Sequence, residues 1–203
     1  MKITCLHTAQ SHVAGFSDLF AQEGWDGDLD HVVRPDLLAR AQGEGAALAD
    51  DLRGLIAGLD GDVILCTCST LGPIVEGFGD QRVLRIDRPA MEAAARYDHV
   101  MLAICLESTR APSVALLRDC GSEANVVLCD DAWPHFEAGD MNGFHRAIAA
   151  RVGSALIDVP KTDCIVLGQA SMRGAAVLLA DTGMRILTTP ILAVRRAIGI
   201  ARR

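Results

Sequence analysis

The residue best suited to chemistry is Cys68, which ends an apolar run and opens the polar segment Cys-Ser-Thr-Leu-Gly-Pro. The run at residues 63–67 is typical of a buried strand, and Pro73 predicts a helix that begins soon after it. Unpaired backbone N–H groups at such a helix start favour a thiolate and bind a carboxylate. The hydroxyls of Ser69 and Thr70 add hydrogen-bond donors, so the segment predicts a reactive thiol beside an anion site.

A second interpretation of this segment is that Cys66 and Cys68 are both packing residues of a strand. Strand alternation puts the two side chains on the same side, with Cys66 deeper and Cys68 at the edge. Cys66-Thr-Cys68 is not a convincing zinc half-site, because no matching pair occurs elsewhere. No mutual spacing typical of a metal site is seen among His31, His99, His135 and His145. We therefore expect no metal ion.

Short apolar runs alternate with longer Ala-rich stretches along the chain. We expect strands at residues 2–6, 29–33, 63–67, 83–86, 100–104, 125–128, 164–167 and 185–187. Helices between them are expected at residues 35–59, 111–120, 143–156 and 190–201. Alternation of helices with β-branched strands predicts an α/β fold whose parallel sheets are covered on both faces.

An internal repeat accompanies this alternation. The run Asp62-Val-Ile-Leu-Cys-Thr-Cys68 aligns with Asp163-Cys-Ile-Val-Leu-Gly-Gln169, a shift of 101 residues. The same shift places Thr8 on Thr109, Val13 on Val114 and Pro89 on Pro190. We predict two pseudo-symmetric three-layer αβα halves with mainly parallel four-stranded sheets, the first of residues 1–97 plus 186–203 and the second of residues 98–185. Ligands of such sheets bind beyond the carboxyl ends of the strands, so we expect a ligand cleft between the halves.

The repeat also predicts which side chains line that cleft. Each half contributes residues at or just after its strand ends: Thr8, Cys68, Thr109 and Gln169. Further candidates for substrate binding are Ser11, Ser108, Ser171 and His7. His7 could hydrogen-bond Cys68 or contact a substrate carboxylate, or it could be only a partly buried turn residue. His12 is expected to face solvent at a helix start.

Several of these segments resemble motifs of the aspartate/glutamate/hydantoin racemase superfamily. Cys68-Ser-Thr at a strand end is similar to the first catalytic-cysteine motif, and Val166-Leu-Gly-Gln169-Ala-Ser is similar to the second. The opening Ile3-Thr-Cys-Leu-His-Thr and the turn Leu106-Glu-Ser-Thr-Arg-Ala-Pro-Ser also have counterparts in that superfamily. The resemblance implies cofactor-independent chemistry, in which two cysteines flank a small carboxylate and exchange its α-proton.

The chain departs from that pattern at Gln169, which stands where the second cysteine is expected. An amide is neither acid nor base at ordinary pH, although it donates and accepts hydrogen bonds. Gln169 therefore argues against symmetric two-thiol racemisation. The resemblance leaves one-thiol reactions open, since the superfamily includes arylmalonate decarboxylases and maleate isomerases. Cys68 corresponds to the cysteine that acts as nucleophile in the isomerases.

Composition excludes several other classes of protein. The formal net charge is −7, without the basic footprint of nucleic-acid binders. Seven cysteines, an odd number in mostly apolar runs, are typical of free thiols in a reducing compartment. No apolar run reaches the roughly 18 residues of a membrane span. Because glycine-rich phosphate loops are also lacking, we expect a cytoplasmic protein that binds no nucleotide cofactor.

From these observations we expect an isomerase or racemase-like enzyme that acts on a small carboxylic acid, an amino acid or a dicarboxylate, through the Cys68 thiolate. The alternatives are a one-thiol decarboxylase or cis-trans isomerase, and a carboxylate-binding descendant without turnover. The expected partner is the small carboxylate alone, with no nucleic acid and no membrane. A homodimer or higher homo-oligomer is left open, because dimers are common in the superfamily.

Overall fold

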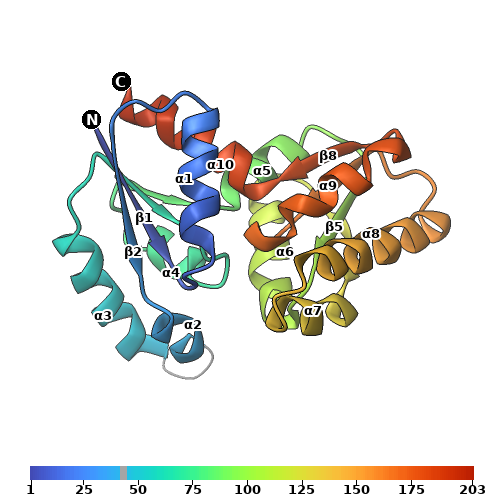
Figure 1. Cartoon of the computed structure of the whole chain (residues 1–203), viewed down its shortest axis with the longest axis horizontal. Coiled ribbons are helices and arrows are strands. Elements are labelled where there is room, and N and C mark those ends of the chain that lie inside the picture. The colour runs from blue at the N-terminus through green and yellow to red at the C-terminus, as the bar shows by residue number, and fades with distance from the viewer. Residues whose placement is uncertain (42–44) are drawn as a thin grey trace. The chain divides into compact units, whose positions relative to one another are not determined.

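The first sheet contains four parallel strands in the order β2-β1-β3-β4 (Figure 1). The computed structural model describes residues 1–41 and 45–203. The strands are β1 (Lys2–His7), β2 (Asp28–Val33), β3 (Val63–Cys66) and β4 (Val83–Arg85). Every residue of β3 is buried, as expected for a central parallel strand whose two faces are both covered by helices.

The second sheet has the same topology, with four parallel strands in the order β6-β5-β7-β8. Its strands are β5 (Val100–Ile104), β6 (Ala124–Leu128), β7 (Cys164–Leu167) and β8 (Arg185–Thr188). The predicted parallel sheets and the two-fold repetition of one α/β design are therefore confirmed. All eight expected strands are present, and those at residues 100–104 and 164–167 have the predicted bounds.

The chain forms two compact units, and it passes from one unit to the other near the start of two helices. The first unit comprises Met1–Arg88 and Pro190–Arg203, and the second comprises Pro89–Thr189. Helices α5 (Arg88–Ala94) and α10 (Thr189–Ala201) each begin one residue before the chain enters the other unit. The boundaries predicted from the sequence, after residues 97 and 185, would instead place α5 and most of β8 with the first unit.

Helices cover both faces of each sheet (Figure 1). In the first unit they are α1 (His12–Gln22), α2 (Asp36–Arg40), α3 (Gly45–Gly58), α4 (Gly72–Glu76) and most of α10. In the second they are most of α5, then α6 (Arg110–Asp119), α7 (Trp133–Glu137), α8 (Met141–Asp158) and α9 (Ala175–Leu178). The helix predicted over residues 35–59 is present as α2 and α3, and its residues 42–44 lie outside the described residues. None of the helices in the described residues is long and apolar enough to cross a membrane.

The shift of 101 residues is correct for only part of the repeat. It relates β3 to β7, from 63 to 164, and the start of α5 to that of α10, from 88 to 189. In the first strands Ile3 pairs with Val63 and Val100 pairs with Cys164, so β1 and β5 are related by a shift of 97. The gapless repeat was therefore wrong there, because the connections that lead to β3 and β7 differ in length.

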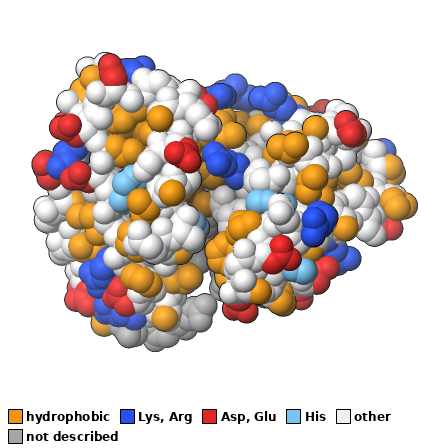
Figure 2. Space-filling model, in the orientation of Figure 1, with side chains coloured by type: hydrophobic (Ala, Val, Ile, Leu, Met, Phe, Trp, Pro, Cys, Tyr) orange, Lys and Arg blue, Asp and Glu red, His pale blue; other side chains and the backbone are white. Residues whose placement is uncertain are grey.

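Charged side chains of both signs are intermixed on the face drawn in Figure 2. Many form local ion pairs. Arg34 lies 2.6 Å from Asp36, and Arg195 on α10 lies 2.7 Å from Glu23 at the end of α1. The second of these pairs attaches the C-terminal helix to the first unit. Such exposed pairs contribute at most about 1 kcal/mol each, so the buried aliphatic cores provide most of the stability.

Candidate active site around Cys68

Cys68 lies where the chain leaves the first sheet. The Thr67 N–H donates to the Leu6 carbonyl at 3.0 Å, which continues the β1–β3 pairing by one residue beyond β3. The Cys68 carbonyl then accepts from the Gly72 N–H at 3.1 Å, which closes the turn that enters α4. The Cys68 side chain is 7% exposed, Ser69 is equally buried and Thr70 is half-buried. The expected helix after Cys68 is therefore present, although α4 has only five residues.

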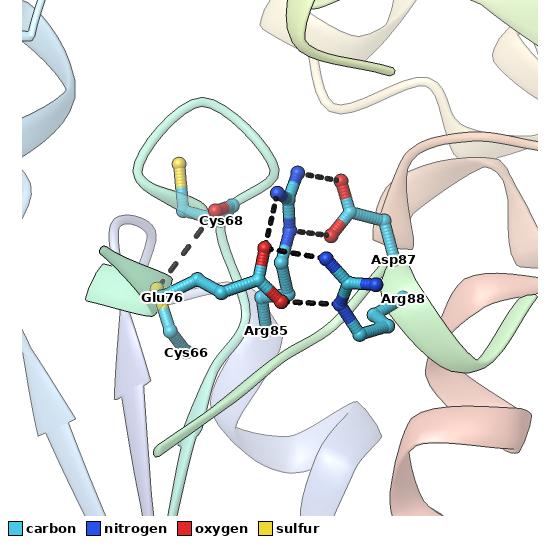
Figure 3. A network of polar contacts seen from close by, with 6 residues as sticks. All are labelled: Cys66, Cys68, Glu76, Arg85, Asp87 and Arg88. Carbon is cyan, nitrogen blue, oxygen red and sulfur yellow. Dashed lines mark hydrogen bonds and ion pairs between the residues drawn. The ribbon is translucent and has the colours of Figure 1, made fainter. Parts of the chain in front are cut away.

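All seven cysteines are free thiols, as predicted. Burial raises the pKa of Cys66, Cys129 and Cys164 to about 12 and also raises the pKa of Cys5 and Cys105. Thiols of this kind are poor nucleophiles near neutral pH, because only the thiolate reacts. The expectation that Cys66 is a packing residue agrees with its complete burial. In Figure 3 the Cys68 side chain points away from Cys66.

A partly buried group of ion pairs lies beside the Cys68 turn (Figure 3). This Arg85 cluster consists of Glu76, Arg85, Asp87 and Arg88. The Arg85 guanidinium donates to both carboxylate oxygens of Asp87, at 2.7 and 2.8 Å, and to Glu76 at 3.1 Å. Arg88 donates to both oxygens of the same Glu76 carboxylate, with Nη2 2.8 Å from Oε2. Two cations and two anions balance one another, so the cluster adds little net charge to the site.

The Arg85 cluster fixes the geometry of the turn through Gly72. A Cβ atom at Gly72 would lie 2.7 Å from Arg85 Nε, so the guanidinium rests directly on the glycine backbone. Burial opposes the charge on Arg85, but the hydrogen bonds and ion pairs with Asp87 and Glu76 together outweigh that penalty and raise the Arg85 pKa. Burial likewise opposes the charge on Glu76, and hydrogen bonds from Arg88 and Arg85 reverse this and lower its pKa. The turn between Cys68 and α4 therefore rests on a hydrogen-bonded group of acidic and basic side chains.

His7 holds the residue that precedes Cys68. It is the last residue of β1, fully buried, and its Nδ1 lies 2.8 Å from Thr67 Oγ1. Because the Thr67 hydroxyl donates to the Leu6 carbonyl at 3.1 Å, it accepts from His7 Nδ1–H. Burial, reinforced by neighbouring histidines, lowers the His7 pKa to about 3, so the ring is neutral near pH 7. His7 positions Thr67, and it has no exposed surface for a substrate.

His12 differs from the expectation that it faces solvent. It begins α1, but its side chain is only half-exposed, and its Nδ1 is buried without a hydrogen-bond partner among the described residues. The His12 ring centroid lies 6.1 Å from that of His7 in an edge-on arrangement. Burial lowers the His12 pKa. The physical reason is that α1 packs its first turn against the carboxyl end of β1.

In the second unit, Gln169 stands at the position that corresponds to Cys68. The Gly168 N–H donates to the Ala103 carbonyl at 2.9 Å, as Thr67 does to Leu6, and the next residue leaves the sheet. The Gln169 Oε1 accepts from the Cys105 N–H at 2.5 Å. This bond extends the β5–β7 pairing with a side chain in place of backbone. The sequence alignment of Cys68 with Gln169 is therefore confirmed at the level of strand register.

The remaining candidates occupy varied environments near the strand ends. Thr8 follows β1 directly and is 9% exposed, and its counterpart by register is Cys105 and not Thr109. Thr109 is buried, and its hydroxyl donates to the Leu106 carbonyl at 2.7 Å. Ser11 and Ser108 are exposed and Ser171 is half-buried. The first unit thus gathers Thr8, Cys68, Ser69 and Thr70 at the ends of neighbouring strands.

Sequence reasoning did not single out Thr67, Glu76 or Arg88 as functional residues. The support that Arg85 gives to the Cys68 turn depends on Glu76, nine residues upstream in the chain. The signal that could have found it is the charge pattern, because two arginines and one aspartate around a buried strand end require partners.

Comparisons with known proteins agree on the fold. No protein-family model matches the chain, and no curated protein matches it by sequence. Among solved structures, aspartate racemase from Picrophilus torridus is similar over 99% of this chain and 94% of its own, with a TM-score of 0.75 and 13% identity. Glutamate racemase from Thermus thermophilus, in complex with β-chloro-D-alanine, covers 98% of this chain and 79% of its own, with a TM-score of 0.73 and 15% identity.

Allantoin racemase from Pseudomonas fluorescens is also similar, with a TM-score of 0.63 and 15% identity over 100% of this chain and 91% of its own. Identities this low show a shared fold and leave the reaction and the substrate open. They agree with the resemblance of the sequence motifs. The chain therefore has the two-unit α/β fold of the aspartate, glutamate and allantoin racemases.

Proposed function

We propose that this protein is a cofactor-independent isomerase of a small carboxylic acid, with the Cys68 thiolate as its base. The observation that carries the proposal is the position of Cys68 on a racemase-like fold. It stands one residue beyond the β3 pairing, in a turn with Ser69 and Thr70. Burial raises the pKa of five other thiols, which are Cys5, Cys66, Cys105, Cys129 and Cys164.

In the proposed reaction the Cys68 thiolate removes the α-proton of the substrate. The electron pair of the broken C–H bond moves into the carboxylate and gives an enediolate, which the hydroxyls of Thr8, Ser69 and Thr70 and nearby N–H groups stabilise by hydrogen bonds. The thiol then returns a proton to carbon. With one thiol, the proton returns to the face it left unless a second donor, such as a water molecule, delivers it to the other face.

Gln169 determines which variant of this chemistry the proposal favours. Its amide carries no titratable proton, so it supplies neither the acid nor the base of a two-thiol mechanism. We therefore propose slow racemisation, with one-thiol decarboxylation or cis-trans isomerisation as the alternative within the same substrate class. A carboxylate-binding protein without turnover is the second candidate, and it is favoured by the same replacement of a reactive thiol by an amide.

The test is incubation in deuterated water with aspartate, glutamate, allantoin, an arylmalonate and maleate, followed by NMR and polarimetry. α-Hydrogen exchange that depends on Cys68 is the expected result for an amino acid, with little or slow change in optical rotation. Loss of carbon dioxide from the arylmalonate, or conversion of maleate to fumarate, would assign one of the alternative reactions.

The matched variants are Cys68→Ser and Cys120→Ser. Cys120 is a half-buried thiol in the second unit, so its replacement controls for general effects of thiol removal. We expect Cys68→Ser to lower exchange by at least about 100-fold, in line with the loss of a general base, and Cys120→Ser to leave it unchanged. Binding of a carboxylate without exchange in the wild type would support the non-catalytic candidate, and equal activity of Cys68→Ser and wild type would refute the proposal.

A further inference from the structure

Strand pairing brings together a cysteine and two histidines in the first unit. Cys5 on β1 pairs directly with His31 on β2, and His7 lies two residues further along β1 on the same face. Each of the three side chains offers one ligand atom, and these atoms all lie within 4.8 Å of one another. Cys5 and His7 are fully buried and His31 is half-buried.

The hydrogen bonds at one end of this cluster orient the His7 lone pair toward His31. His7 Nδ1–H donates to Thr67 Oγ1, whose own proton is used by the Leu6 carbonyl. A neutral imidazole carries one N–H, so His7 Nε2 is left as an acceptor. Nε2 lies 2.9 Å from His31 Nδ1.

The other end of the cluster brings a second lone pair toward the first. His31 Nε2 lies 2.9 Å from Ser17 Oγ, and that hydroxyl also lies 3.1 Å from the Val13 carbonyl one helical turn earlier. When Ser17 donates its single proton to Val13, it must accept from His31 Nε2–H. His31 Nδ1 then presents a lone pair to His7 Nε2, with the Cys5 sulfur beside both. A second proton on either ring would turn this contact between two lone pairs into a hydrogen bond. Burial disfavours protonation of both His7 and His31, because it lowers the pKa of each ring.

We propose that Cys5, His7 and His31 bind a Zn²⁺ ion or a similar borderline transition-metal ion. Thiolate sulfur and neutral imidazole nitrogen are ligands that zinc prefers, and three protein ligands leave a fourth position of the tetrahedron open. Zinc–nitrogen bonds of about 2.0–2.1 Å at a tetrahedral angle require the two nitrogens to be roughly 3.3 Å apart. The observed 2.9 Å therefore needs a movement of only a few tenths of an ångström.

The surroundings support the metal in two ways. Thr67 accepts from the nitrogen of His7 that faces away from the cluster, the outer-shell contact that fixes the tautomer of a metal-bound histidine. His12 faces His7 with a buried Nδ1 that has no partner among the described residues. Binding of the metal ion would release the Cys5 proton to solvent. The positive charge of the ion would offset the cost of a buried thiolate. The bound ion would hold His7, and through it Thr67, in place beside Cys68.

The test is titration of the chelator-treated full chain with Co²⁺, which replaces zinc and reports its ligands by absorption. We expect one equivalent to bind, with a sulfur-to-cobalt charge-transfer band and the strong visible bands of a tetrahedral site. Zn²⁺ should displace it and raise the thermal unfolding midpoint. His31→Asn, at a half-buried position, should abolish stoichiometric binding while the chain stays folded. His135→Asn, at an exposed histidine, should leave cobalt binding unchanged.

A further pair of variants separates the ligands from their support. Cys5→Ser should remove the charge-transfer band, and Thr67→Val should weaken binding about 10- to 100-fold while the band remains. Cobalt that binds without the sulfur band, or that binds His31→Asn as tightly as the wild type, would overturn the proposal. These readouts need no turnover, so they are independent of the reaction proposed for Cys68.

Discussion

The side-chain carbonyl of Gln169 accepts a hydrogen bond from the backbone N–H of Cys105, with 2.5 Å between Oε1 and N. The Gln169 side chain thereby extends the pairing of β5 and β7 at the carboxyl ends of these strands, and its carbonyl oxygen is occupied by this bond. In the first unit the corresponding residue, Cys68, leaves the sheet without such a side-chain bond to β1 among those that the structure describes. The two units therefore use one backbone position for different purposes, a thiol in one and a structural amide in the other.

Replacement of Gln169 by Cys should raise racemisation relative to α-hydrogen exchange, because a second titratable group becomes available. It should also cost about 1 kcal/mol of unfolding free energy, since the Cys105 N–H loses its acceptor. Polarimetry and exchange by NMR measure the first effect, and urea unfolding measures the second. Ser171→Cys introduces a thiol two residues away and is the control. Unchanged optical rotation with intact exchange would contradict the assignment of Gln169 to the second-cysteine position.

Gly72→Ala should destabilise the protein by about 1–3 kcal/mol, because the new methyl group would lie 2.7 Å from the buried Arg85 guanidinium. Gly54→Ala is the matched control. Gly54 lies on the exposed face of α3 with open space around it, so alanine should stabilise the helix by up to about 1 kcal/mol. Denaturant unfolding compares the two. A neutral Gly72→Ala would show that Arg85 does not rest on the turn.

Asp87→Asn should cost about 3 kcal/mol or more, because it leaves the buried Arg85 guanidinium without the carboxylate that binds two of its nitrogens. Asp51→Asn removes one partner of an exposed pair with Arg40 and should change stability by less than about 1 kcal/mol. The alkylation rate of Cys68 is a second readout, since a loosened turn changes access to the thiol. Equal unfolding free energies for the two variants would refute the structural role of the Arg85 cluster.

Stability should fall in acid because of the buried histidines. The His7 pKa is about 3 when folded and 6.5 in its ordinary state, so between these values the unfolded chain binds a proton that the folded chain does not. The contribution of neutral His7 to the free energy of unfolding is therefore complete above about pH 6.5, and it is lost as the pH falls toward about 3. It amounts to the order of 3–5 kcal/mol for His7.

The measurement is urea unfolding between about pH 4 and about pH 8 in the presence of a chelator, which keeps metal binding out of the comparison. His7→Gln should flatten the profile, and His135→Gln, at an exposed position, should leave it unchanged. A His7→Gln variant with the wild-type slope would mean that other groups cause the acid sensitivity.

The amino-acid sequence by itself determined the fold class and the identity of the candidate thiol. Apolar β-branched runs predict parallel strands, and each expected strand is present. The match of Asp62–Cys68 with Asp163–Gln169 placed Cys68 and Gln169 at corresponding strand ends, and the register agrees. These features are local, because they depend on side-chain type along a few consecutive residues.

Only the tertiary structure decided what lies around Cys68. Cys5 and His31 are 26 residues apart in the chain and become neighbours solely through the β1–β2 register, so their spacing predicts nothing. The correspondence of Thr8 with Cys105 instead of Thr109 likewise depends on strand pairing, which a gapless alignment cannot follow when connections differ in length. Hydrogen bonds and ion pairs between distant segments depend on how those segments pack and on strand register, so the order of residues along the chain does not reveal them.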